Sequence, residues 1–231
     1  MIAFLSHLFG SLEIKQYLCG QLVEDRLMSE ENTIEIEILS EENGLLVAED
    51  QVRDIFSLLE DLRIERGASF IKTLKEIVKH PSFFPVKGEI NTYSTGGEGG
   101  DDYDNLLNAA RKAVEHGYRV FILPNPKEFR TADFIFERRG IYKLFDLKTI
   151  SGKSIVETRL IESIGQTNRV LLNMTVDYNP ALLARNIKRY FERSNEAMEV
   201  LIFKGKKTVS VDRDLTLSSD YYSIFMKRYV K

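Results

Sequence analysis

The chain has 231 residues, one cysteine, a hydrophobic fraction of 43% and a formal net charge of -3. This length suits one large domain or a modest domain with an extension, and the hydrophobic fraction excludes disorder throughout. The lone Cys19 excludes an intrachain disulfide and fits a reducing compartment, so we expect a cytoplasmic protein.

The chain is expected to have no membrane association. Residues 1–10 are apolar, but they are too short to span a bilayer and lack the basic region and cleavage site of a signal peptide. Residues 24–65 are acidic, whereas residues 185–207 and the C-terminus are basic. A local basic rim is sufficient for a nucleic-acid partner, because contacts to phosphates supply most of the affinity.

Residues 1–85 are predicted to form an α+β region of unknown role. The expected elements are helices over residues 5–27, 50–67 and 69–79, a half-buried strand over residues 33–38 and a turn at Asn43 and Gly44. Residues 86–100 form a predicted linker, because residues 95–100 are rich in glycine. No strand-to-helix phosphate-binding fingerprint accompanies these glycines, which favours a plain loop.

Residues 101–231 are predicted to form a second domain. The expected elements are a helix over 104–116, a strand over 118–123, a hairpin over 130–148, a helix from the capping box at Ser154 to Gly165, a strand over 170–174, a helix over 180–191, a hairpin turning at Gly205 and a helix from residue 217. When the hairpin is counted as two strands, the elements up to residue 174 follow the order helix, three strands, helix, strand. This order predicts an α/β sandwich.

The predicted hairpin concentrates charged side chains on one face. If its turn centres between Arg139 and Gly140, Asp133 and Asp146 lie opposite each other. Lys148 shares their face, because side chains of a strand alternate with a period of two. Neighbouring carboxylates repel unless a cation lies between them, and hard oxygen ligands suit Mg²⁺ or Mn²⁺. The expected chemistry is metal-dependent hydrolysis of nucleic acid. An ordinary solvated charged face remains the alternative, since the tripeptide Glu13-Ile14-Lys15 has the same local pattern.

The segments GYRVFILP, TADFIF, LFDLKTISGKS and IGQTNRVLLN resemble the PD-(D/E)xK nuclease superfamily. More narrowly, they are similar to the tRNA-cleaving toxin domains of bacterial contact-dependent inhibition proteins, which have DNA-cleaving relatives. The resemblance implies a restriction-endonuclease-like α-β-β-β-α-β core. It also implies that Asp133 and Asp146 bind metal, that Lys148 is the catalytic lysine and that Gln166 faces the site.

The resemblance further implies a metal-binding acid on the first helix of this core. Asp104 is the best placed, followed by Asp101, Asp102 and Glu98. The chain departs from the family pattern at Ala132, where proline is frequent, and at Asp146, where glutamate is commoner.

Three functions follow as hypotheses. The leading one is a metal-dependent nuclease that cuts RNA, in particular tRNA, as a bacterial toxin domain with an immunity or inhibitor protein as partner. The second is a DNA nuclease of a mobile element or defence system, which shares every site residue. The third is a degenerate, non-catalytic nuclease fold that binds nucleic acid or protein.

Overall fold

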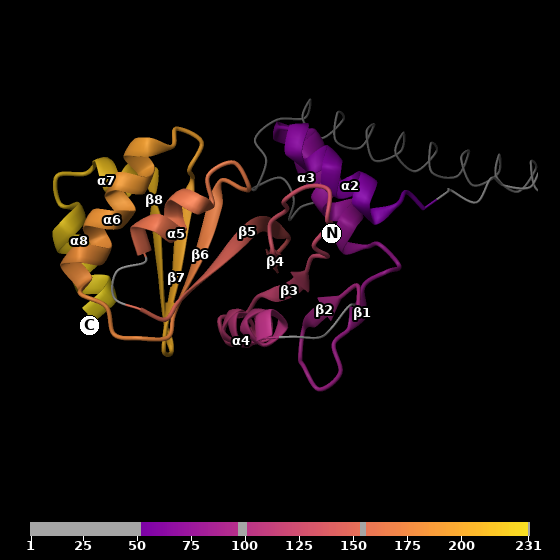
Figure 1. Cartoon of the computed structure of the whole chain (residues 1–231), viewed down its shortest axis with the longest axis horizontal. Coiled ribbons are helices and arrows are strands. Elements are labelled where there is room, and N and C mark those ends of the chain that lie inside the picture. Colours follow the sequence, from indigo (N-terminus) through magenta and orange to yellow (C-terminus); the bar gives the residue numbers. More distant parts are fainter. Residues whose placement is uncertain (1–51, 97–100, 153–155, 231) are drawn as a thin grey trace, which may run out of the picture. The chain divides into compact units, whose positions relative to one another are not determined.

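A computed structural model describes residues 52–96, 101–152 and 156–230 of the chain (Figure 1). The elements predicted before residue 50, residues 97–100 of the linker and Ser154 lie outside the described residues. The described helices are α2 (Ile55–Ile64), α3 (Gly67–Val78), α4 (Asp101–Glu115), α5 (Val156–Glu162), α6 (Pro180–Arg193), α7 (Arg213–Leu217) and α8 (Tyr221–Val230). The described strands are β1 (Phe84–Pro85), β2 (Thr92–Ser94), β3 (Arg119–Ile122), β4 (Phe134–Arg138), β5 (Ile141–Ile150), β6 (Arg169–Met174), β7 (Glu199–Lys204) and β8 (Lys207–Asp212).

The strands form one eight-stranded sheet, in which each strand pairs with its neighbours in the sequence from β1 to β8. The pairs β2/β3, β5/β6 and β6/β7 are parallel. The pairs β1/β2, β3/β4, β4/β5 and β7/β8 are antiparallel. Along the chain, α4, β3, β4, β5, α5 and β6 follow one another, so the predicted order of a helix, three strands, a helix and a strand is confirmed. The described part is a mixed α/β fold, as predicted.

The predicted hairpin of β4 and β5 is confirmed. The register of the two strands leaves Arg139 and Gly140 as the turn residues. Their φ angles of 54° and 76° are the positive values that a two-residue type I′ turn requires, and a glycine adopts such an angle without steric cost. Carried one residue beyond the paired strands, this register places Asp133 opposite Asp146.

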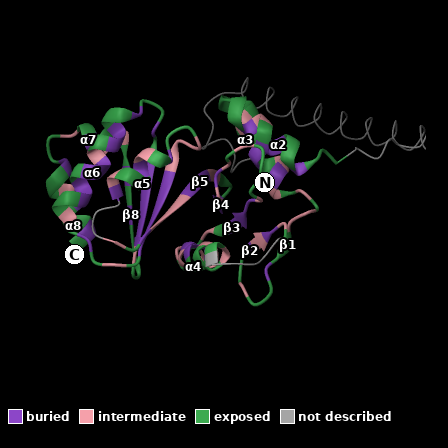
Figure 2. Cartoon of the chain, in the orientation of Figure 1, coloured by how far each residue is buried: buried purple, intermediate pink, exposed green. Residues whose placement is uncertain are grey.

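The two faces of the sheet are covered differently. On one face, side chains such as Phe134, Phe145 and Leu171 pack against the alanines of α4. On the other face, one core joins α2 and α3 to β3, β4 and β5, and a second core joins α5, α6 and α8 to β5, β6, β7 and β8. Figure 2 shows buried residues in the central strands and exposed residues on the outer sides of the helices. Strand β5 therefore borders three separate cores.

Helices α2 and α3 correspond to the two helices predicted over residues 50–67 and 69–79, and α2 is shorter than predicted at both ends. The Asp54 carboxylate accepts hydrogen bonds from the backbone N of Phe56 and Ser57 at 3.1 Å, so α2 begins at Ile55. Gly67, with a φ of 62°, opens α3 in a new direction.

Helices α2 and α3 pack against the sheet and belong to the same compact unit. From Arg53 onward the chain forms one compact unit, which includes both helices and the predicted linker. The predicted boundary after residue 85 instead assigns these helices to a separate N-terminal region. Their apolar faces cover β3, β4 and β5, and this burial of apolar surface joins them to the sheet.

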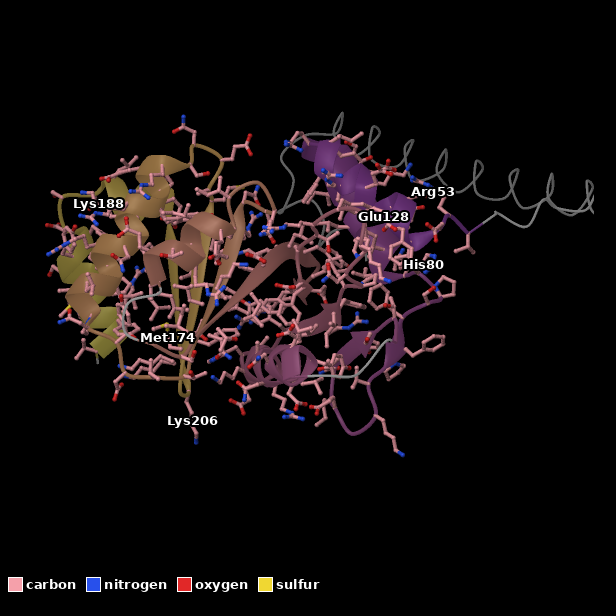
Figure 3. The ribbon with its side chains drawn as sticks, in the orientation of Figure 1. Arg53, His80, Glu128, Met174, Lys188 and Lys206 are labelled. Atoms are coloured by element: carbon pink, nitrogen blue, oxygen red, sulfur yellow. The ribbon has the colours of Figure 1, made fainter. Side chains whose placement is uncertain are left out.

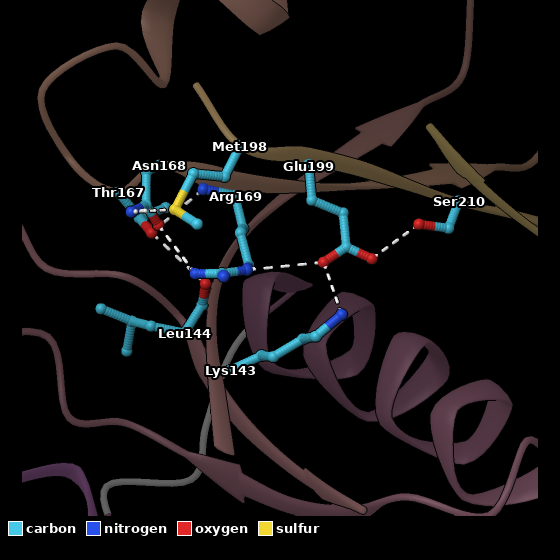
Figure 4. A network of polar contacts seen from close by, with 8 residues as sticks. All are labelled: Lys143, Leu144, Thr167, Asn168, Arg169, Met198, Glu199 and Ser210. Carbon is cyan, nitrogen blue, oxygen red and sulfur yellow. Dashed lines mark hydrogen bonds and ion pairs between the residues drawn. The ribbon is translucent and has the colours of Figure 1, made fainter. Parts of the chain in front are cut away.

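A polar network ties β5, β6, β7 and β8 together on the α4 face (Figure 4). At its centre is Glu199, which is buried. Its Oε2 accepts a hydrogen bond from Lys143 Nζ and its Oε1 one from Ser210 Oγ, each at 2.7 Å. The Nε atom of Arg169 lies 3.4 Å from the same Oε2. Each of the four strands contributes one side chain, so this network, named the Glu199 cluster, favours the observed register.

Candidate active site

Two charged residues of β5, Asp146 and Lys148, lie in a gap between two hydrophobic cores. Asp146 and Lys148 alternate with Phe145 and Leu147, which pack on the α4 face, so both point to the opposite face. On that face, Leu144 belongs to the core of α2 and α3, whereas Ile150 belongs to the core of α5, α6 and α8. Asp146 and Lys148 thus occupy the positions of β5 that neither apolar core fills.

Asp133 is fixed beside this gap by backbone hydrogen bonds. Its N–H donates to the carbonyl of Phe145 at 3.0 Å, and its own carbonyl accepts from the N–H of Leu123 at 2.9 Å. Its side-chain Oδ2 accepts a hydrogen bond of 2.6 Å from the backbone N of Leu147. The carboxylate of Asp133 is therefore turned toward β5, next to that of Asp146.

Lys148 pairs with only one of the two acids. Its Nζ lies 2.9 Å from Oδ2 and 3.1 Å from Oδ1 of Asp146. The side chains of Lys148 and Asp146 are 14% and 3% exposed. Among the described residues, Oδ1 receives a directed hydrogen bond from Lys148, whereas the buried Oδ2 receives none. Asp146 therefore retains an oxygen with unused acceptor capacity.

Both carboxyl groups resist ionisation. Burial, followed by the negative charge of Asp146, raises the pKa of Asp133 to about 7, although the Leu147 N–H and Lys148 act in the opposite direction. Burial also raises the pKa of Asp146, against the positive charges of Lys148 and Arg130. One ammonium group faces two carboxyl groups, so the cluster needs a proton or a further cation at neutral pH. We name Asp133, Asp146 and Lys148 the Asp146 cluster.

Two neighbours of the Asp146 cluster were not found from the sequence. The positive charge of Arg130 acts on the carboxylate of Asp146. Burial is the main cause of the raised pKa of Tyr190 on α6, and the negative charge of Asp146 raises this pKa further. Arg130 lies shortly before Asp133 in the sequence, so its proximity to this acid is visible in the sequence. No local pattern marks Tyr190, which reaches the site only because α6 packs over the sheet.

Gln166, which the resemblance implies faces the site, lies after the end of helix α5. Helix α5 ends at Glu162, and Gln166 follows in a turn, where its Nε2 donates to the carbonyl of Glu162 at 2.8 Å. It lines a cavity of about 30 Å³. The other lining residues come from α2, β5 and the segment around Arg130, and they are Leu59, Leu62, Arg63, Leu123, Arg130, Thr131, Ala132 and Leu144.

Asp104 is not brought into contact with the cluster. It is exposed on α4, and its charge acts on Arg111 of the same helix. Within the described part of the chain it makes no hydrogen bond or ion pair with Asp133, Asp146 or Lys148. Asp102 is likewise exposed on α4, whereas Glu98 and the side chain of Asp101 lie outside what the structure describes.

We found no match to this chain among protein families, curated proteins or solved structures. Over residues 52–96, 101–152 and 156–230, no helix is long and apolar enough to cross a membrane. The same residues contain no group of three or more His, Cys, Asp or Glu side chains placed to hold a metal ion.

The two carboxylates nevertheless fit a hard divalent cation. Mg²⁺ typically binds one or two carboxylates and completes its octahedron with water and phosphate oxygens. The Oδ2 of Asp146, which receives no directed hydrogen bond from the described residues, is the kind of atom that such a cation takes. A cation there would also supply the positive charge that the Asp146 cluster lacks.

Proposed function

We propose that the protein is a metal-dependent nuclease that hydrolyses phosphodiester bonds. The observation that carries the proposal is the Asp146 cluster: two neighbouring carboxyl groups with raised pKa values, one lysine and a buried oxygen that receives no directed hydrogen bond from the described residues, placed between two hydrophobic cores. Structural ion pairs normally approach charge balance and satisfy their oxygen atoms. Perturbed and incompletely satisfied groups of this kind are typical of functional sites.

Each residue of the cluster has a chemical role in this proposal. Asp133 and Asp146 would hold Mg²⁺ or Mn²⁺, which when bound lowers the pKa of water and offsets charge on the phosphate. Lys148 would orient the attacking water or stabilise the negative charge that develops on the phosphate. Its ion pair with Asp146 already holds the ammonium group at the cluster.

The substrate and biological setting rest on resemblance. The order α4-β3-β4-β5-α5-β6 supports a restriction-endonuclease-like core, in which Asp133, Asp146 and Lys148 match the motif of the PD-(D/E)xK nucleases. On this basis we propose RNA, in particular tRNA, as the substrate of a bacterial toxin domain, with an immunity or inhibitor protein as partner. A DNA nuclease of a mobile element or defence system would use the same residues.

A degenerate, non-catalytic nuclease fold is the second candidate. It is favoured by one observation: the first-helix acid Asp104 makes no described contact with the cluster, so the proposed cation has two carboxylates rather than three. Loss of a ligand can leave a folded site that binds nucleic acid without cutting it. Such a protein would bind oligonucleotides and remain inert with every cation.

The first experiment is cleavage of total tRNA and of plasmid DNA by the full chain, with Mg²⁺, with Mn²⁺ and with a chelator. We expect cutting that requires the cation and that disappears in Asp146→Asn, which keeps the size of the side chain but removes its charge. The matched control is Asp212→Asn, because Asp212 is an exposed residue that caps α7 at the end of β8.

The outcomes separate the candidates. Cation-dependent cutting by the wild type and by Asp212→Asn, but not by Asp146→Asn, supports the nuclease and identifies its substrate. A folded wild type that cuts neither substrate with either cation would exclude the nuclease and leave the binding module.

A further inference from the structure

Two arginines line the cavity beside the Asp146 cluster. Arg63 comes from α2 and Arg130 from the segment before β4, and Gln166 adds an amide from the turn after α5. Ala132 also lines the cavity, and Asp133 is the next residue of the chain. Arg130 is close enough to Asp146 to act on its carboxylate electrostatically. The cavity therefore adjoins the proposed reaction centre.

Neither arginine is neutralised by a carboxylate in the described part of the chain. The guanidinium of Arg63 lies over the ring of Phe129, with its Cζ 5.1 Å from the ring centroid. Phe129 directly precedes Arg130, so this stacking holds the two cationic side chains in the same region. Both arginines are exposed, which leaves their N–H groups accessible to a ligand.

The chemistry of the cavity selects the ligand. Guanidinium groups bind the oxygens of phosphate in a bidentate manner. In addition, a polyanion that approaches two buried carboxylates is repelled unless cations lie along its path. Arg63 and Arg130 are placed to provide them.

From this convergence we propose that Arg63, Arg130 and Gln166 form a subsite for a backbone phosphate next to the scissile one. The proposal rests on the proposed nuclease function and deepens it. A second phosphate position beside the reaction centre means that the substrate is a polynucleotide rather than a mononucleotide. Because phosphate contacts carry no sequence information, the subsite positions the strand without selecting bases.

The test measures binding separately from cutting. The probes are a fluorescently labelled single-stranded RNA and a DNA of the same sequence, bound to the full chain carrying Lys148→Ala in Mg²⁺ and followed by anisotropy over a range of salt concentrations. Arg63→Gln and Arg130→Gln are added singly to this background. Glutamine removes the charge but keeps most of the aliphatic stem, and thermal melting checks that each variant is folded.

The control is Lys206→Ala in the same background. Lys206 is an exposed residue in the turn between β7 and β8, and Figure 3 shows it projecting away from the sheet. Val170 pairs with Asp146 and with Val200 near the start of β7, whereas Lys206 follows the end of β7. The control thus removes one positive charge at the end of the strands that lies away from Asp146.

We expect each arginine substitution to weaken binding about tenfold and to lower the slope of log affinity against log salt by about one, with the control within twofold. Unchanged affinity in both arginine variants, no binding of either probe or an equal loss in the control would overturn the subsite.

The same series distinguishes failure of the subsite from failure of the nuclease. If the wild type cuts and the arginine variants bind normally, the nuclease stands and the subsite falls. If the arginine variants lose binding but the wild type never cuts, Arg63 and Arg130 form a phosphate-binding site, but the nuclease falls and with it the scissile phosphate beside that site.

Discussion

Strand β5 carries two charged clusters on opposite faces, and they differ in how they are balanced. In the Glu199 cluster, one buried carboxylate faces two cations, and each of its oxygens accepts a hydrogen bond of 2.7 Å. In the Asp146 cluster, two carboxyl groups face one cation, and a buried oxygen receives no directed hydrogen bond from the described residues.

The contrast separates a structural use of buried charge from a chemical one. A satisfied carboxylate that links four strands favours one register of the sheet, because any slip would leave it unpaired. A pair of neighbouring carboxyl groups with raised pKa values lowers the stability of the metal-free protein, and such an energetic cost is retained in evolution where the site has a ligand. Substitutions in the two clusters should therefore have opposite consequences, and four predictions test this.

The largest expected effect is on activity, in a comparison of two lysines of the same strand. Lys148→Ala should reduce the rate of cleavage by roughly 10²–10⁴-fold, the usual contribution of a group that stabilises or protonates the reacting centre. Lys143→Ala, on the other face of β5, should leave the rate per folded molecule unchanged. The measurement is the initial rate on the substrate identified above, and equal losses in the two variants would contradict the assignment of the site to one face.

The second prediction concerns stability in the Glu199 cluster. Glu199→Ala removes a buried carboxylate and leaves the partly buried Lys143 and Arg169 without their partner; breaking a buried ion pair typically costs up to about 3–5 kcal/mol of unfolding free energy. Urea denaturation followed by circular dichroism measures the change. A loss below about 1 kcal/mol, the range of exposed pairs, would show that the cluster does not stabilise the sheet.

The third prediction is stabilisation by a divalent cation. At a concentration one hundred times its dissociation constant, Mg²⁺ or Mn²⁺ should stabilise the wild type by about 2.7 kcal/mol. Asp146→Asn should abolish this gain, whereas Glu199→Gln, in the other cluster, should retain it. Thermal melting with cation and with chelator gives both values, and a gain that survives in Asp146→Asn would place the cation elsewhere.

The fourth prediction gives the pH dependence of the Asp146 cluster. Because the folded-state pKa of Asp133 is raised from 3.8 to about 7, this group stabilises the fold fully at low pH, and that contribution is lost as the pH rises through about 7. Asp133→Asn cannot ionise, and its amide oxygen can still accept from the Leu147 N–H. In chelator at about pH 8 it should therefore be more stable than the wild type by on the order of 2 kcal/mol.

The gain in Asp133→Asn should shrink toward about pH 4, where the wild-type carboxyl is also neutral. Adding the divalent cation should reverse the order at high pH, because only the wild type keeps both ligands. A variant less stable than the wild type at every pH in chelator would mean that the Asp133 carboxylate is satisfied by its present contacts.

Much of the hairpin and of the Asp146 cluster could be predicted from the sequence. The turn at Arg139 and Gly140 and the alternation of side chains are local properties, and together they bring Asp133, Asp146 and Lys148 to one face. The order of helices and strands after residue 101 was also predictable, because hydrophobic periodicity marks each element. The resemblance singled out Gln166, and the structure places it in a turn, where it lines the same cavity as Arg130.

Other features depended on contacts between distant segments. The docking of α2 and α3 on the sheet, which contributes Arg63 to the cavity, carries no signal in the local sequence. The same holds for Tyr190, which the packing of α6 brings into the field of Asp146. Asp104 illustrates the converse: its place on α4 was predictable, but its lack of contact with the cluster depends on where that helix packs.

The sequence by itself determined the elements from α4 to β8, the register of the hairpin and the three residues of the Asp146 cluster, because turn geometry and the period of a strand act over a few neighbouring residues. The short helix α7 was not among the predicted elements. Only the tertiary structure decided which surfaces cover each face of β5. Packing buried the two carboxyl groups between separate cores, raised their pKa values and placed two arginines beside them. These properties depend on desolvation and on charges that meet only when the chain is folded.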